Sequence, residues 1–353
     1  MRVAVVGAGA IGAFVGAHLT QSGTETYLVA RGAHLAAMQA DGLCVVGERG
    51  TVRVDVAATD DPDQIGQVDV VFLGLKAYSY AGAAPLLEPL LAADTAAVAA
   101  QNGIPWWYFH RHGGPFDGRR IESVDPDGAV SSVIDPRRAI GCVVYPAAEL
   151  VAPGVVRHIE GNRFTLGEPD GTISERCRRL SMAMTAAGFK CPVSRNVREQ
   201  IWVKLMGNAA FNPLSALTGA TMAQLCEFGS TRRLVAGLME EIGTVAAALG
   251  CPMRVSVDQR LAGAEAVGDH KTSMLQDLET GKPLELNVLL AAVIELSEWV
   301  DVEVPNLRAV YAATALLERV RRQPPVIEPP PRRTRPQGAA GADALSPPEV
   351  EAD

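Results

Sequence analysis

The pattern of apolar and polar residues changes once along the chain. In the first half, short apolar runs rich in β-branched residues alternate with segments whose apolar residues recur at helical spacing. The runs predict strands at 2–6, 26–30, 68–75 and 96–100, and the segments predict helices at 10–22, 34–40 and 85–91. Strands that alternate with helices predict an α/β fold with a doubly wound, mostly parallel sheet.

The part of the chain before residue 190 also contains shorter strand-like segments and one irregular stretch. Two valine-rich pieces predict a small hairpin at 45–46 and 52–56, and later runs predict strands at 140–145, 155–158 and 163–166 before a helix at 174–187. Residues 110–138 are rich in Gly, Pro, Asp and Arg and predict a long loop. The aromatic residues at 106–109 are expected to pack beneath that loop, with a wall of a substrate pocket as the alternative.

From residue 194 onward the spacing is helical only. Glycines and prolines divide this part into predicted helices at 194–211, 221–249, 256–279, 284–300 and 306–322. The residues from Gln323 onward include eight prolines and no apolar period, so they predict a disordered tail. We therefore expect a sheet domain over residues 1–190, an all-α domain over 191–322 and a tail over 323–353.

Composition and charge exclude several classes of partner. The net charge is −8, and the only dense basic block lies at Arg332, Arg333 and Arg335, which argues against nucleic acid. The six cysteines have no metal-ligand spacing and are expected to be reduced thiols in a cytoplasmic protein without a bound metal. The apolar start of the chain resembles a signal peptide, but its glycines argue against export, and no later segment is expected to span a membrane. A homodimer is left open.

A glycine-rich turn joins the first predicted strand to the first predicted helix. The sequence Gly7-Ala8-Gly9-Ala10-Ile11-Gly12 is GxGxxG in the context of a strand, a turn and a helix, which is typical of a Rossmann dinucleotide site. Its first glycine permits the turn, the second admits a pyrophosphate, and the third lets helix and strand pack closely. The alternative is a Gly/Ala-rich helix start that binds nothing.

The end of the second predicted strand distinguishes the two nicotinamide cofactors. An NAD enzyme usually places a carboxylate there for the ribose 2′-hydroxyl, whereas here the chain continues Ala30-Arg31. A guanidinium suits a 2′-phosphate, so Arg31 favours NADP, the alternative being an Arg that only faces solvent at a helix start.

Three polar residues interrupt the apolar helix predicted around residue 204. Lys204, Asn208 and Asn212 are spaced four residues apart, and over two such steps they drift only about 80° around the helix axis. They therefore form one polar stripe, which must face either water or a polar ligand. Lys76 and Asn102 follow predicted parallel strands, so both are expected at the carboxyl edge of the sheet, where open α/β sheets bind ligands.

Taken in order, these pieces resemble the ketopantoate reductase (2-dehydropantoate 2-reductase) family over residues 1 to about 320. The matching segments are VVGAGAIG, LVARGAHL, LGLKAY, QNG, WVKLMGNAAFNP and KTSMLQDLETGKPLE. The resemblance implies reduction of a 2-oxo acid with NADPH, ketopantoate above all, on the route to pantothenate, in a cleft between a Rossmann domain and a helical domain.

The same resemblance assigns roles residue by residue. Lys204 matches the general acid and Glu285 the substrate-binding carboxylate of the catalytic pair, while Asn102, Asn208, Asn212 and Ser273 match substrate-contacting residues. Residues 7–12, Arg31, Lys76 and Asn102 match the cofactor side of the cleft. The segment after Glu285, Leu286 to Ala291, is more apolar than the family pattern, which leaves the exact acid open.

The chemistry agrees with these roles, although each residue has a simpler interpretation. A positioned ammonium can stabilise the charge that grows on a carbonyl oxygen and then protonate it, provided that burial lowers its pKa. Alternatively, Lys204 and Lys76 are surface charges, Glu285 is favoured by a helix dipole, Ser273 faces solvent, and Asn102 begins a generic turn. The rival functions are a dehydrogenase for another 2-hydroxy or imino acid and a non-catalytic NADP-binding module.

Overall fold

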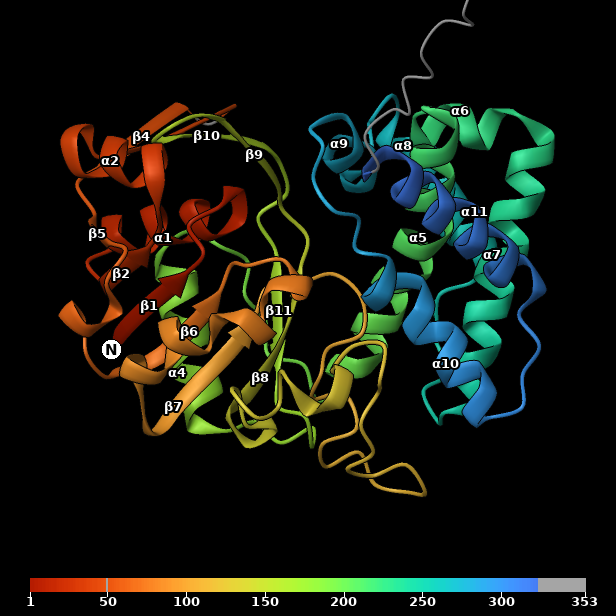
Figure 1. The fold of residues 1–353 in the computed structure, drawn as a ribbon, viewed down its shortest axis with the longest axis horizontal. Helices are drawn as coiled ribbons and strands as arrows, with labels where there is room; N and C mark the ends of the chain where they lie inside the picture. Colours follow the sequence, from red (N-terminus) through yellow and green to blue (C-terminus); the bar gives the residue numbers. More distant parts are fainter. Residues whose placement is uncertain (49, 323–353) are drawn as a thin grey trace, which may run out of the picture.

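The computed structural model describes residues 1–48 and 50–322, and the chain folds into a sheet region and a helical region that lie side by side (Figure 1). The strands and the first helices lie on one side of the view, and α5 to α11 gather on the other. Within the described residues, no helix combines the length and the apolar character that crossing a membrane requires. The predicted tail at 323–353 lies outside the described residues.

The main sheet has seven strands in the order β11-β8-β7-β6-β1-β2-β5. All neighbours from β5 to β8 are parallel and only β11 is antiparallel, which confirms the doubly wound, mostly parallel sheet. Its order from β5 to β8 is that of the dinucleotide-binding fold, with the reversal between β1 and β6. The strands are β1 Arg2–Val6, β2 Glu25–Val29, β5 Ala57–Thr59, β6 Val68–Leu73, β7 Leu91–Ala99, β8 Ala139–Val144 and β11 Phe164–Gly167.

Alternate residues of the central strands enter two different cores, since successive side chains of a strand point to opposite faces. Val3 and Val5 pack with the core beneath α1 (Ala10–Gln21) and α4 (Glu175–Ala186). Ala4 and Val6 pack on the opposite face, in a core that continues into the helical region. Burial on both faces explains why these strands read as continuous apolar runs.

A second sheet of four strands covers part of α1, in the order β4-β3-β10-β9. The expected hairpin is present as antiparallel β3 and β4, but β3 also pairs in parallel with β10, a partner more than one hundred residues away. The prediction missed β9 entirely, because its residues are half-buried or exposed and carry no strong apolar period. The strands are β3 Leu43–Gly47, β4 Gly50–Val54, β9 Ala147–Ala152 and β10 Val155–Glu160.

The predicted helix at 85–91 was too long. Only α3 (Ala84–Leu87) is α-helical there; it runs into a 3-10 turn at Glu88–Leu90, and Leu91 already begins β7. Pro89 explains the change, because it lacks the N–H that an α-helix needs at this position. The helix predicted at 34–40 is present as α2 (Gly32–Asp41).

The helical region contains more helices than predicted, because two predicted segments are divided. The segment expected at 221–249 divides at Phe228, whose backbone is extended, and the segment at 256–279 divides after Gly268, whose φ is 74°. Capping boxes at Thr221 and Ser256 fix two of the helix starts. The helices are α6 Met222–Glu227, α7 Gly229–Ala248, α8 Val257–Val267, α9 Ser273–Glu279, α10 Ala292–Trp299 and α11 Pro305–Arg322, with a π-helical turn at Asn287–Ala291.

Helix α5 (Val197–Thr218) is the central element of this region and joins it to the sheet. It packs against α7, α9 and α11 on one side and against β8 and β11 on the other. The helix continues beyond the predicted end at residue 211 and passes through Pro213. Trp202 and Leu205 of α5 share one apolar core with Val71 and Ala97 of the sheet, so the position of α5 relative to the sheet is fixed by packing.

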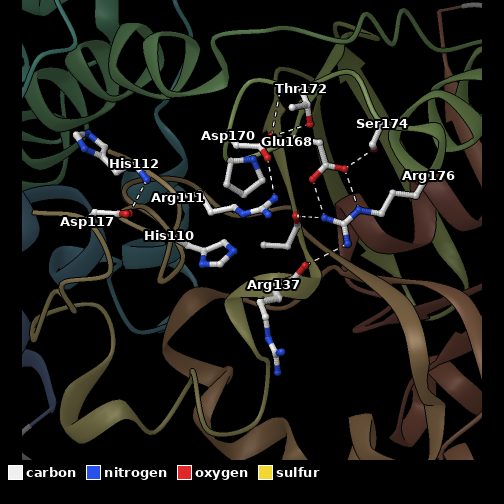
Figure 2. Close-up of polar contacts among 12 residues, drawn as sticks. His110, Arg111, His112, Asp117, Arg137, Glu168, Asp170, Thr172, Ser174 and Arg176 are labelled. Atoms are coloured by element: carbon white, nitrogen blue, oxygen red, sulfur yellow. Dashed lines mark hydrogen bonds and ion pairs between the residues drawn. The ribbon is translucent and has the colours of Figure 1, made fainter. Parts of the chain in front are cut away.

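The long loop at 110–138 has no strand or α-helix, as predicted, and its first and last parts are anchored at the edge of the sheet where β8 begins and the antiparallel β11 ends. Figure 2 shows the anchoring contacts, including an ion pair of 2.7 Å between Arg111 and Asp170. Glu168 accepts from Arg176, which in turn donates to the carbonyl of Ala139, the first residue of β8, at 3.1 Å. The aromatic residues at 106–109 are all buried, which confirms their packing role.

Candidate active site

Four strands of the main sheet deliver polar groups to one edge. The glycine turn follows β1, Lys76 follows β6, Asn102 follows β7, and the carbonyl of Val144 ends β8. Because these strands are parallel, all four groups lie at the carboxyl edge, where open α/β sheets hold their ligands.

The glycine turn has the geometry that a pyrophosphate requires. Gly7 has a φ of 90°, and a Cβ there would lie 2.6 Å from the side chain of Leu75, so no other residue fits without displacing Leu75. A Cβ on Gly12 would overlap the carbonyl oxygen of Gly7, whereas a Cβ on Gly9 would meet nothing nearer than 3.9 Å. No side chain in the described chain caps the N-terminus of α1, so its N–H groups are free for an anion. The cradle therefore fits a dinucleotide.

Arg31 lies close to the glycine turn. It is exposed and forms the N-cap of α2, two residues after β2. The last carbonyl of β2, at Val29, accepts hydrogen bonds from Gly7 and Ala8 at 3.1 and 3.2 Å, so the end of β2 adjoins the glycine turn. No Asp or Glu stands in the chain between Val29 and Arg31.

The polar stripe of α5 faces this edge of the sheet and not bulk water. The ammonium of Lys204 donates to Oδ1 of Asn102 at 2.7 Å and to the carbonyl oxygen of Val144. Asn208 donates to the same Asn102 oxygen at 3.3 Å. A cation from the helical region is thus held between two neighbouring strands of the sheet, β7 and β8.

The environment of Lys204 weakens its hold on the proton. Burial lowers the pKa of Lys204 to about 8, against opposing effects of Glu285 and Cys142, and the charge of Lys76 lowers it further. Its two acceptors, an amide oxygen and a carbonyl oxygen, carry no formal charge. The ammonium can therefore give up its proton near neutral pH, which an ordinary exposed lysine cannot.

Glu285 forms a buried charge cluster with Lys76. Nζ of Lys76 lies 3.0 Å from Oε2 of Glu285 and 2.7 Å from Oδ2 of Asp277. Asn102 donates to the same Glu285 oxygen at 3.4 Å, so Asn102 links Glu285 to Lys204. Although burial opposes it, the two carboxylates raise the pKa of Lys76 to about 12, so this lysine keeps its charge to a much higher pH than Lys204.

The remaining predicted pair lies further along α5. Asn212, which is buried, donates to the hydroxyl of Ser273 at 3.5 Å, and Ser273 is exposed at the start of α9. Asn212 continues the stripe that Lys204 and Asn208 begin. The structure thus brings Lys204, Asn208, Asn102, Glu285 and Lys76 into one hydrogen-bonded group, and joins Asn212 of α5 to Ser273 of α9 in a second pair.

The turn that carries Asn102 is pinned to the segment after Glu285. Gly103 has a φ of 79°, and a Cβ there would overlap the carbonyl oxygen of Val288, which accepts from the N–H of Ile104 at 2.9 Å. Val288 belongs to the π-helical turn Asn287–Ala291. Turns of this kind are rare in helices and often occur at functional sites. Asn102-Gly103 is therefore not a generic surface turn.

Two members of the group escaped the sequence analysis. Asp277 lies in the quoted segment KTSMLQDLETGKPLE, and the signal that could have found it is a carboxylate among the buried residues Met274, Leu275 and Leu278 of α9. The carbonyl of Val144 carries no side-chain signal, so only the fold reveals it. The middle of the long loop also reaches Glu285, since Ser123 and Val130 line a cavity of about 450 Å³ together with it.

The sheet order and the glycine turn define a dinucleotide-binding fold, and the comparisons with known proteins define its class as an NAD(P)-dependent oxidoreductase. Residues 3–110 match the model of ketopantoate reductase PanE/ApbA, and residues 196–318 match its C-terminal model. A 2-dehydropantoate 2-reductase from Mesorhizobium japonicum is 47% identical over 88% of this chain and 96% of its own length. The chain belongs to the ketopantoate reductase family.

Solved structures agree on the fold. A putative ketopantoate reductase from Ralstonia solanacearum is 36% identical, with a TM-score of 0.86, and covers 91% of this chain and 98% of its own. A D-mandelate dehydrogenase solved with NADH and anilino(oxo)acetate has a TM-score of 0.77 over 91% of this chain and 99% of its own. At 21% identity this second likeness concerns the fold alone.

Proposed function

We propose that the protein reduces 2-dehydropantoate (ketopantoate) to pantoate with NADPH, and that Lys204 is the general acid. The observation that carries the proposal is the ammonium of Lys204, held 2.7 Å from Asn102 at the carboxyl edge of the sheet with a pKa lowered to about 8. The name of the Mesorhizobium japonicum relative supports the substrate.

The chain supplies a positioned charge and then a proton. A bound nicotinamide supplies the hydride. As charge grows on the carbonyl oxygen of the substrate, the ammonium of Lys204 stabilises it and transfers a proton from Nζ to that oxygen. Asn102 and the carbonyl of Val144 hold Nζ in place throughout, so little reorganisation is needed.

Substrate binding falls to the groups around Lys204. Glu285 can accept a hydrogen bond from a hydroxyl of the substrate, Asn208 and Asn212 supply amide groups on one face of α5, and Ser273 of α9 supplies a hydroxyl beside Asn212. Asn102 lies between the substrate and cofactor sides of the cleft. Lys76 orients Glu285 by its ion pair and, at the end of β6, is within the part of the sheet edge that a dinucleotide crosses.

The preference for NADPH rests on Arg31. It stands where an NAD-dependent enzyme would carry a carboxylate, and its guanidinium can bind a 2′-phosphate with two hydrogen bonds. Residues 7–12 would hold the pyrophosphate through backbone N–H groups at the start of α1.

A substrate panel tests the proposal. The purified protein is mixed with NADPH and, separately, with ketopantoate, pyruvate, 2-oxoisovalerate and phenylglyoxylate, and the loss of nicotinamide absorbance is followed. We expect kcat/KM for ketopantoate to exceed that for every other acid by at least tenfold. Faster turnover of another acid would favour a related dehydrogenase. The apolar segment 286–291, which departs from the family pattern, is the reason to include that alternative. Tight NADPH binding without turnover of any acid would favour a binding module.

A further inference from the structure

A second cationic side chain, Arg260, reaches the polar face of α5. Arg260 lies in the first half of α8, and its guanidinium covers Gly207, so closely that a Cβ on Gly207 would overlap Nη2. Gly207 follows Lys204 by three residues and precedes Asn208, so it borders the polar stripe. The guanidinium therefore lies against the helix that carries the proposed general acid.

No group in the described part of the chain compensates this cation. Nε of Arg260 is buried and has no hydrogen-bond partner, and no carboxylate of residues 1–48 or 50–322 lies within ion-pair distance of the guanidinium. Burial also lowers the pKa of Arg260, although an arginine stays charged. The side chain is half-buried, and a half-buried charge without a partner is less stable than a paired one, so the arrangement favours an anionic ligand.

Glycine at position 207 lowers the stability of α5 but leaves room for the side chain of Arg260. A glycine inside a helix costs about 1 kcal/mol relative to alanine, and Gly207 is a buried position in the middle of α5. The missing Cβ leaves the space that Nη2 occupies. Gly207 and Arg260 thus form one unit, in which the glycine makes room for the cation.

The location of Arg260 favours the substrate over the cofactor phosphates. The guanidinium lies over Gly207, one turn of α5 from Lys204, and its charge, with that of Arg163, opposes the rise that burial causes in the pKa of the Tyr145 hydroxyl. Tyr145 directly follows Val144, the residue whose carbonyl holds Lys204. In the sheet β8 is three strands from β1, or about 14 Å at the usual spacing, and the glycine turn follows β1.

We propose that Arg260 binds the carboxylate of the 2-oxo acid. This inference rests on the proposed function and adds the residue that selects an acid over a neutral ketone. A 2-oxo acid carries its carboxylate on the carbon next to the reacting carbonyl, so a substrate held by Lys204 presents that group to a neighbouring cation. A guanidinium can bind a carboxylate with two parallel hydrogen bonds, which fixes the orientation of the carbonyl as well.

A kinetic comparison tests this role. Ketopantoate and its lactone share the reacting carbonyl, but the lactone has no carboxylate. We expect Arg260→Gln to raise KM for ketopantoate about 10- to 100-fold, with kcat changed less than threefold and the kcat/KM of the lactone unchanged. Arg254→Gln removes an arginine whose side chain is 91% exposed and is the matched control, with no expected effect. Equal losses for acid and lactone, or a change confined to NADPH affinity, would overturn the proposal.

A binding measurement keeps this test separate from the proposed reaction. Titration calorimetry with oxamate, a small unreactive analogue of 2-oxo acids, in the presence of NADP⁺ reports the anion site whether or not ketopantoate is turned over. We expect at least tenfold weaker binding by Arg260→Gln and by Gly207→Ala, whose Cβ would displace the guanidinium, while neither variant melts at a lower temperature than the parent. Absent binding by the parent, or equal affinity in all three proteins, would refute the role of Arg260.

Discussion

Lys76 and Glu285, which are 209 residues apart in the chain, form an ion pair of 3.0 Å across the two regions of the molecule. Glu285 is almost fully buried, whereas about a third of the Lys76 side chain is exposed. The residue expected on the cofactor side therefore neutralises the carboxylate expected to hold the substrate. A substrate hydroxyl that binds Glu285 has to share this carboxylate with Lys76, so binding on the two sides of the cleft is physically coupled.

Removal of the Lys204 ammonium should abolish most of the turnover and leave the cofactor bound. For Lys204→Ala we expect kcat to fall about 10²- to 10⁴-fold, the usual contribution of a general acid. The dissociation constant of NADPH, measured by fluorescence titration, should stay within twofold, because Lys204 contacts the ends of β7 and β8 and not the glycine turn. A variant with unchanged kcat would take Lys204 out of the mechanism.

The reaction should depend on pH through the same group. The proton donor must be protonated for reduction, so kcat/KM for ketopantoate should be level below pH 8 and fall about tenfold per unit above it, since the pKa of Lys204 is lowered to about 8. Oxidation of pantoate needs the neutral amine and should rise through the same pH. Initial rates between pH 6 and 10 in both directions check this. A reduction rate that stays level to pH 10 would contradict the assignment.

Loss of the Lys76 ammonium should destabilise the fold. Lys76→Met leaves Asp277 and Glu285 close together without their cation, and we expect the free energy of unfolding to fall by about 2–3 kcal/mol. The value is below that of a fully buried pair because water reaches part of the Lys76 side chain. Urea denaturation measures it. In a double-mutant cycle, Asp277→Asn should cost much less in the Lys76→Met background; strictly additive effects would mean that the pair is not coupled.

Two glycines of similar backbone conformation should respond differently to alanine. Gly103 and Gly113 have φ of 79° and 72°, so both substitutions carry the strain of a left-handed residue, about 1–2 kcal/mol. Gly113 has open space around it, whereas a Cβ on Gly103 meets the carbonyl of Val288, so Gly103→Ala should lose about 3–5 kcal/mol and shift Asn102. Denaturation midpoints and kcat of the two variants test this, and equal midpoints would contradict it.

Arg31 should separate the two nicotinamide cofactors. Arg31→Ala removes a donor pair that only the 2′-phosphate can use, so we expect the dissociation constant of NADPH to rise at least tenfold and that of NADH to change less than threefold. Fluorescence titration with both cofactors measures the two constants. Arg178→Ala, at an exposed arginine of α4, is the control. Parallel weakening of both cofactors would place Arg31 away from the phosphate.

The sequence predicted the central strands of the sheet well, because they are buried on both faces and therefore carry a strong apolar signal, but it missed the short, partly exposed edge strand β5. It predicted β9 and the helix breaks at Phe228 and Gly268 poorly, since exposed strands and short connections depend on packing partners elsewhere in the chain. Pro213 did not end α5, because the surrounding apolar core holds the helix together at that point.

The residues of the site also divide into those that the sequence predicted and those that it did not. The four-residue spacing predicted the stripe on α5, and the strand ends predicted Asn102 at the sheet edge, but only the resemblance to the family implied that Lys204, Asn208 and Asn102 meet. Their catalytic roles stay predictions until variants are measured. Asp277 was missed although it supplies one of the two negative charges beside Lys76, because one carboxylate in an amphipathic helix looks like a solvent-facing residue. Arg260 was missed because its position beside the site depends on its contact with Gly207, which lies on another helix.

The parallel pairing of β3 with β10 has a consequence for dissecting the chain. A fragment that stops near residue 110 would contain every residue of the glycine cradle, yet it would lack β8, β10 and the aromatic contacts of α5. Its β7 and β3 would become open edges, ready to pair with other molecules. We therefore expect nucleotide binding to require the chain through α5. A truncated N-terminal fragment should aggregate and should not bind a nucleotide on its own.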